Sequence, residues 1–208
     1  MAHISFRNVI KSYDDKLVLD KVTLDFPEYG FVCIIGPSGI GKTTILNLLL
    51  GLQTPDCGEV SVDPDAVISV VFQEDRLLPW ESTLENVLLP CDSSRNRGPA
   101  RDKAICILSE LGLGEELDTL PDELSGGMAR RVSIARALVV DADIYLMDEP
   151  TKGLDEDTRK MTLDVIHRYT DQCAQGKGLP DKRLLIMITH DPEEIQGAYV
   201  IRLPKGDG

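Results

Sequence analysis

Residues 36–43 read GPSGIGKT, which fits the pattern G-x-x-x-x-G-K-[ST]. The apolar run FVCII (31–35) precedes them, as expected of a strand buried on both faces, and a segment with helical spacing (43–50) follows. A glycine-rich turn between such a strand and a helix points successive backbone N–H groups at one place, where the helix dipole adds positive charge. The stretch therefore predicts a loop that binds the phosphates of a nucleoside triphosphate. In this loop Lys42 reaches the β- and γ-phosphates, and the Thr43 hydroxyl ligates Mg²⁺.

Segments with strand character precede this loop, and segments with helix and strand character follow it. Strands are predicted at residues 3–9, 18–26, 31–35, 67–72, 144–147 and 184–189, and helices at 43–50, 83–89, 101–112, 126–140 and 155–172, with a surface loop at 173–183. This alternation implies an α/β fold with a mainly parallel sheet. We expect one domain over residues 1–208. Its P-loop NTPase core (1–74 and 141–208) carries an N-terminal antiparallel β element, and about 75–140 form an inserted helical subdomain.

The overall composition excludes several classes of protein. The net charge of −13 argues against a nucleic-acid partner, because phosphate backbones require a basic footprint. No apolar run reaches the 18 or more residues that a membrane-spanning helix needs. The cysteines are scattered and lack C-x-x-C spacing, which favours reduced structural thiols over a zinc site: Cys33, Cys57, Cys91, Cys106 and Cys173.

Two further segments carry chemistry. The apolar strand IYLM (144–147) ends in Asp148 and Glu149, a position from which Asp148 can hold Mg²⁺ through water and Glu149 can polarise an attacking water. LSGGM (124–128) precedes a predicted helix, so its serine and glycines would form a second helix N-terminus that binds anions. Taken singly, the first segment could be an acidic cap on a strand and the second an ordinary helix N-cap.

The order of these motifs resembles the ATP-binding-cassette ATPases over nearly the whole chain. The resemblance rests on the phosphate loop, Gln73, LSGGM (124–128), IYLMDEP (144–150), TKGLD (151–155) and THD (189–191). The SGGM signature and FQEDRLLPW (72–80) resemble importers of nitrate, sulfonate and taurine, whereas PTKGLD (150–155) is more similar to the energy-coupling importers of vitamins and metals.

The resemblance implies a head-to-tail dimer that encloses two ATP molecules, with the phosphate loop of one subunit facing the LSGG segment of the other. Implied ATP contacts within one subunit are Tyr13, which stacks on adenine, and Gly36, Pro37, Ser38, Gly39, Gly41, Lys42, Thr43 and Thr44. Implied contacts across the dimer are Ser125, Gly126, Gly127 and Asp155. The implied Mg²⁺ ligands are Thr43, Gln73 and Asp148, and the implied catalytic residues are Glu149, His190, Gln73 and Lys42.

The function expected from this resemblance is ATP hydrolysis that powers solute import. The partners would be an integral membrane permease, a second copy of this chain or a related ATPase subunit, and, through the permease, a solute-binding protein. The chain would lie at the cytoplasmic face of the cell membrane, where Leu77 and Trp80 would contact the permease. Two alternatives remain open: the ATPase of an exporter or lipid-extraction complex, and a soluble cassette ATPase in translation or repair.

Overall fold

The computed structural model describes residues 4–14, 16–91, 98–171, 183–189, 191 and 194–203, and it divides into two compact units. The first unit draws on Met1–Ile68, Ala142–Glu149 and Leu179–Gly208, and the second on Ser69–Asp141 and Pro150–Gly178. Among the described residues, no helix has both the length and the apolar character needed to cross a membrane.

The first unit contains an antiparallel sheet in the order β2-β1-β4, made of β1 (Ile4–Tyr13), β2 (Lys16–Asp25) and β4 (Cys57–Val62). Three apolar residues of β1 enter the core: Ile4, Phe6 and Val9 are each at most 1% exposed, with a break in the register between Phe6 and Val9. A β-carbon on Gly58 would lie 2.3 Å from the carbonyl oxygen of Asn8, so this close pairing of β4 with β1 requires glycine.

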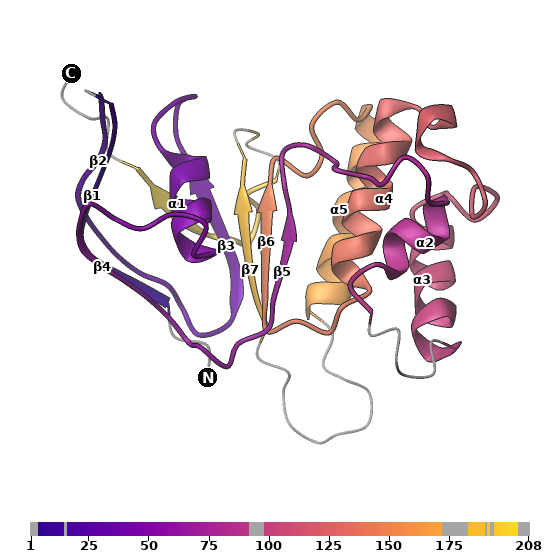
Figure 1. Cartoon of the computed structure of the whole chain (residues 1–208), viewed down its shortest axis with the longest axis horizontal. Coiled ribbons are helices and arrows are strands. Elements are labelled where there is room, and N and C mark those ends of the chain that lie inside the picture. Colours follow the sequence, from indigo (N-terminus) through magenta and orange to yellow (C-terminus); the bar gives the residue numbers. More distant parts are fainter. Residues whose placement is uncertain are drawn as a thin grey trace. The chain divides into compact units, whose positions relative to one another are not determined.

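The same unit contains a parallel sheet with the order β6-β7-β3-β8, formed by β6 (Ile144–Asp148), β7 (Leu184–Ile188), β3 (Gly30–Ile35) and β8 (Tyr199–Arg202). Every residue of β6 and β7 is buried, as their continuous apolar sequences predict. Helix α1 (Lys42–Leu49) lies between the antiparallel sheet and β3, and it buries its apolar residues there (Figure 1).

The second unit is mainly helical, with α2 (Thr83–Leu88), α3 (Gly98–Glu110), the short 3-10 turn η1 (Pro121–Glu123), α4 (Gly126–Leu138) and α5 (Glu156–Asp171). The strand β5 (Ile68–Val71) begins at the boundary between the units. Helix α4 packs against α2, α3 and α5, and its core positions Val132, Ile134 and Leu138 are fully buried. Figure 1 shows these four helices as one group.

The predicted α/β class is confirmed, with a parallel sheet, an N-terminal antiparallel element and a helical part. Two strands were not predicted: β4 and β8. The helix expected at 101–112 begins earlier, at Gly98, and ends at Glu110. The loop expected at 173–183 lies outside the described residues apart from Arg183. The domain boundaries at about 75 and 140 stay a prediction.

Candidate nucleotide site

The phosphate loop joins β3 to α1, and Lys42 is the first residue of the helix. The Lys42 ammonium donates hydrogen bonds to the carbonyl oxygens of Gly36 at 2.7 Å and Pro37 at 2.9 Å. Its side chain therefore folds back over the loop, and the whole residue is only 8% exposed. No side chain caps the first turn of α1, so the loop and the helix N-terminus keep backbone N–H groups for an anion.

Two glycines of the loop adopt backbone angles that other residues rarely adopt. Gly41 has φ 103 and Gly39 has φ 77. A β-carbon on Gly41 would lie 2.9 Å from side-chain atoms of both Leu19 and Val18, whereas one on Gly39 would meet nothing within 4 Å. Gly41 is thus required by conformation and by packing against β2, and Gly39 by conformation alone.

A hydroxyl and a carboxylate meet beside this loop. The Thr43 hydroxyl donates a hydrogen bond to Asp148 at 3.0 Å, and Asp148 is 3% exposed at the end of β6. Hydroxyl and carboxylate oxygens are ligands of the hard kind that Mg²⁺ prefers, and one or two protein ligands suffice when phosphate and water complete the octahedron. The pair therefore fits the predicted ion. Within the part of the chain that the structure describes, no cluster of three or more His, Cys, Asp or Glu side chains offers an all-protein metal site.

Glu149 follows Asp148 directly and has φ 47, in the left-handed region. Its N–H donates a hydrogen bond to the carbonyl oxygen of Ile188 at 2.9 Å, which holds this backbone in place. A non-glycine residue with positive φ is uncommon, and such outliers cluster at functional sites. The carboxyl group predicted to polarise water is therefore carried by a strained backbone position.

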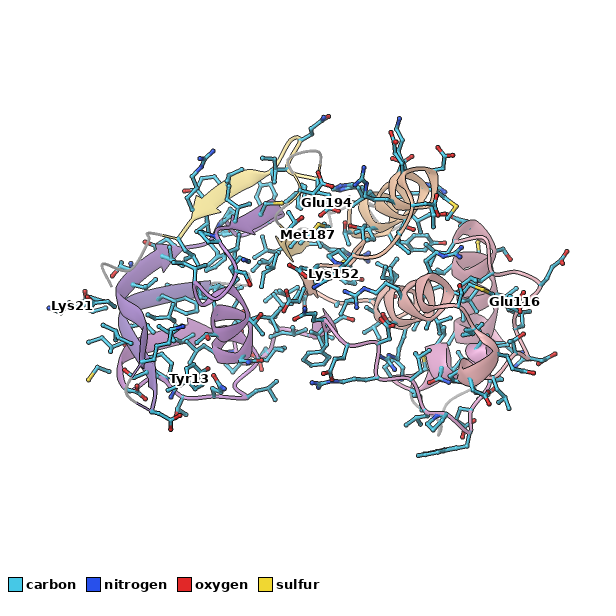
Figure 2. The ribbon with its side chains drawn as sticks, turned by 90° about the horizontal axis from the view of Figure 1, so that it is seen from above. Tyr13, Lys21, Glu116, Lys152, Met187 and Glu194 are labelled. Atoms are coloured by element: carbon cyan, nitrogen blue, oxygen red, sulfur yellow. The ribbon has the colours of Figure 1, made fainter. Side chains whose placement is uncertain are left out.

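Tyr13 lies at the end of β1, in the first unit (Figure 2). Its hydroxyl donates a hydrogen bond to the Gln53 side chain and lies 3.4 Å from the hydroxyl of Thr44 in α1. The Lys11 ammonium lies 5.7 Å from the ring centroid and pairs with Asp56 at 2.8 Å. These contacts fix the position of the ring. Tyr13 is still 37% exposed, and an aromatic side chain that stacks on a base must be accessible in this way. Sequence reasoning missed Gln53, because a lone glutamine in a loop carries no signal.

The signature segment begins α4 in the second unit. The Ser125 hydroxyl accepts a hydrogen bond from the N–H of Met128 at 3.3 Å, and Gly126 and Gly127 form the first turn. A β-carbon on Gly126 would meet nothing within 4 Å, and one on Gly127 would lie 3.2 Å from a methyl group of Leu154. The segment that ends in Asp155 thus packs beside the signature glycines.

Asp155 caps the first turn of α5. Its carboxylate accepts a hydrogen bond from the N–H of Thr158 at 3.1 Å. Hydrogen bonds from the Thr158 hydroxyl and then from its N–H hold the pKa of Asp155 below its usual range. Asp155 is exposed and anionic, so the cap leaves it accessible to a second subunit.

Gln73 is exposed and follows β5 in the second unit. Its carbonyl oxygen accepts a hydrogen bond from the buried guanidinium of Arg130 at 3.3 Å. Sequence reasoning missed this role of Arg130, which lies within the helix predicted at 126–140. The predicted site residues thus fall into two groups, one in each unit. His190 lies outside the described residues.

The glycine-rich loop between strand and helix, with its lysine and its Thr–Asp pair, defines a P-loop nucleotide-binding protein. A sequence model of the family described as ABC transporter matches residues 19–152. The chain therefore belongs to the ABC transporter family, as an ATP-binding cassette, and the predicted resemblance is confirmed.

Among curated relatives, the chain is 42% identical over 193 residues to the aliphatic sulfonates import ATP-binding protein of Agrobacterium fabrum, covering 91% of this chain and 66% of the relative. It is 40% identical over 183 residues to the taurine import ATP-binding protein of Rhizobium johnstonii, covering 85% and 67%. The chain thus spans about two thirds of the length of these relatives.

Solved structures agree at the level of the fold. The dimeric ATP-binding cassette MJ0796, in a post-hydrolysis state with ADP and Pi, superposes with a TM-score of 0.81 at 30% identity, covering 96% of this chain and 94% of that one. A bacterial Atm1-family ABC exporter with ATP bound gives 0.80 at 26% identity, covering 98% and 37%. Since cassettes of an exporter match as well, the fold alone does not distinguish import from export.

Proposed function

We propose that this chain is the ATP-binding and ATP-hydrolysing subunit of an importer and works on a separate membrane permease. The observation that carries the catalytic part is the contact of the Thr43 hydroxyl with the Asp148 carboxylate beside a loop already held by Lys42. The importer part is supported by the two curated relatives, both named as import ATP-binding proteins.

In the proposed reaction the backbone N–H groups of the loop and the Lys42 ammonium bind the phosphates of ATP. Thr43 and Asp148 would hold Mg²⁺, with Gln73 as the third ligand implied by the resemblance; when bound, the ion neutralises charge on the phosphate oxygens. Glu149 accepts a proton from the attacking water, and His190 contacts the γ-phosphate. Tyr13 stacks on the adenine.

A single subunit supplies only part of the positive field around the γ-phosphate. We therefore propose that Ser125, Gly126 and Gly127 of a second copy complete it, as the resemblance implies, so that ATP holds the dimer together and hydrolysis releases it. The dimeric state of the MJ0796 cassette supports this proposal. Gly126, where a side chain would meet only open space on its own subunit, is suited to a close approach by a ligand on another.

The permease contact is proposed at the turn after Gln73. Trp80 is 71% exposed, which is unusual for so large an apolar side chain. Fully buried Asn86 fixes the turn, because its amide accepts a hydrogen bond from the N–H of Leu78 at 2.8 Å and donates to the carbonyl oxygen of Glu81 at 2.9 Å. A rigid turn that exposes an indole is suited to bind an apolar partner. Leu77 belongs to the same turn in the sequence and would contribute a second apolar side chain. With this contact, the location that we propose for the chain is the cytoplasmic face of the membrane.

The class of solute we propose is a small organic sulfonate. The support is the naming of the two relatives as aliphatic sulfonates and taurine import ATP-binding proteins. The choice of solute would rest with the permease and a solute-binding protein, so the substrate must be tested on the assembled complex.

The test of the catalytic proposal is Glu149→Gln, with Lys42→Ala as the comparison. Glu149→Gln removes the charge that activates water but keeps the phosphate loop, so it should bind ATP and accumulate as an ATP-bound dimer in size-exclusion chromatography with light scattering. Lys42→Ala should weaken ATP binding itself and remain monomeric. Hydrolysis by Glu149→Gln at the parental rate would show that Glu149 is not the base.

The importer proposal is tested by gentle purification from the native membrane. We expect a small permease and a solute-binding protein to accompany the chain, and the complex to take up taurine or an alkanesulfonate in vesicles. A permease without a solute-binding protein, with efflux of solute, would establish the exporter alternative. Soluble partners alone would exclude a transporter.

A further inference from the structure

Arg130 is a buried cation for which the proposed reaction has no use. It lies in α4, five residues after Ser125, and is 4% exposed. Its Nε donates a hydrogen bond to the carbonyl oxygen of Pro150 at 2.9 Å, and its Nη1 donates to the carbonyl oxygen of Phe72 at 2.5 Å. Nη1 also lies 3.3 Å from the carbonyl oxygen of Gln73. One guanidinium thus contacts two chain segments that are far apart in the sequence.

The segment 72–76 is bound to α4 by more than this one contact. Asp75 accepts an ion-paired hydrogen bond from Arg130 at 3.1 Å. Farther along the helix, Arg136 donates hydrogen bonds to the carbonyl oxygens of Asp75 at 2.7 Å and Arg76 at 2.9 Å. Except for the Asp75 carboxylate, all these acceptors on the segment are backbone carbonyl oxygens, so α4 fixes the path of the chain around Gln73.

Burying the charge of Arg130 is a poor means of gaining stability, because removing it from water costs about as much as its attraction to half-buried Asp75 returns. A buried guanidinium does fix geometry, because its planar group donates hydrogen bonds in several defined directions at once. Here Nε donates to the carbonyl oxygen of Pro150, the residue directly after Glu149. Nη1 donates to the carbonyl oxygens of Phe72 and Gln73. A lysine ammonium, a point charge on a flexible stem, cannot reproduce this divided contact.

We infer that Arg130 is a positioning residue. It fixes the backbone at Gln73 and the residue after Glu149 to the helix that begins with the signature glycines. The inference rests on the proposed function, because the roles of Gln73 and Glu149 come from it. A contact made by a second subunit at the start of α4 would then reach Gln73 through one side chain.

The test compares Arg130→Lys with the parent, and Arg168→Lys is the matched control. Arg168 is an exposed arginine of α5 that pairs only with Glu110 among the ion pairs described, so it makes the same chemical change without touching segment 72–76. Hydrogen–deuterium exchange is followed by mass spectrometry on peptides that cover 70–77 and 132–138, and kcat and KM for ATP are measured on the same samples.

In Arg130→Lys we expect exchange in 70–77 to accelerate about tenfold, while 132–138 stays within about twofold of the parent. We expect kcat to fall about tenfold with KM for ATP nearly unchanged, since ATP binding does not depend on this contact. The control should match the parent in all four measurements.

Parental exchange at 70–77 in Arg130→Lys would overturn the inference, because the segment would then be fixed by other contacts. Faster exchange with unchanged kcat would also overturn it, since the position of Gln73 would not matter. If Arg130→Lys exchanges rapidly in all peptides, Asp75→Asn is the second variant that tests the inference. It keeps the carbonyl acceptors but loses the ion pair with Arg130. We expect it to accelerate exchange at 70–77 by about threefold, and parental exchange there would overturn the inference. If the parent protein does not hydrolyse ATP but Arg130→Lys still exchanges faster at 70–77, the proposed function would be refuted. The contact of Arg130 with segment 72–76 would still be established.

Discussion

Gly41→Ala should destabilise the first unit by an amount that can be divided into two contributions. Alanine must adopt φ 103 at this position, which costs about 1–3 kcal/mol. Its β-carbon would also lie 2.9 Å from methyl groups of Leu19 and Val18, and relieving that overlap costs about 1–3 kcal/mol more. The total is about 2–6 kcal/mol, which corresponds to a fall in Tm of about 4–24 °C for a chain of this size.

Gly39→Ala is the control that separates these contributions. Gly39 has φ 77, and its β-carbon would meet nothing within 4 Å, so only the conformational cost of about 1–3 kcal/mol applies. The assay is urea and thermal unfolding of both variants without nucleotide, followed by circular dichroism. We expect Gly41→Ala to be less stable than Gly39→Ala by about 1–3 kcal/mol. Equal stability of the two variants would refute the packing argument, and parental stability of both would refute the conformational one.

Four further predictions address the dimer, the thiols (two of them) and the permease. Gly126→Ala should leave Tm within about 2 °C of the parent, since its β-carbon meets only open space, yet lower ATP hydrolysis if a second subunit's γ-phosphate approaches there; unimpaired hydrolysis would argue against that approach. Burial raises the pKa of Cys33 to about 12, so maleimide at pH 8 should label exposed Cys57 and spare Cys33, as peptide mass spectrometry will show. The raised pKa of Cys33 also means that its stabilising effect is complete below pH 9 and is lost as pH rises toward 12, so the urea midpoint should fall over that range. Trp80→Glu should abolish transport by the assembled complex while ATP binding stays intact, and parental transport would exclude this docking surface.

The central strands could be predicted because each is a short continuous apolar run. β3, β6 and β7 are buried on both faces, and their sequences FVCII, IYLM and LLIMIT require burial of that kind. β4 and β8 could not be predicted in the same way. β4 buries no residue fully and contains Gly58, and β8 buries only Ile201, so neither shows a clear alternation. Their pairing with β1 and β3 is decided by tertiary contacts.

The candidate site was predictable where short motifs specify backbone geometry. The phosphate loop, Asp148 and the serine cap of α4 lie where the sequence indicates. Residues that position other residues through hydrogen bonds were not marked by any sequence motif. Gln53 binds Tyr13 from 40 positions away, and Arg130 binds Phe72 from 58 positions away. Such pairs become visible only when the chain is folded, because neither partner has an unusual local sequence.

The contact of Arg130 with carbonyl oxygens has a consequence for how this subunit can diversify. Every residue type presents a carbonyl oxygen, so the side chains of Phe72 and Gln73 are not what the guanidinium recognises. Apart from Asp75, whose carboxylate pairs with Arg130, the residues that follow can therefore accept new side chains without loosening the attachment of this segment to α4. If the proposed permease contact lies there, a cassette built in this way can be adapted to a different permease by changing its exposed side chains, while the position of the backbone at Gln73 relative to α4 stays the same.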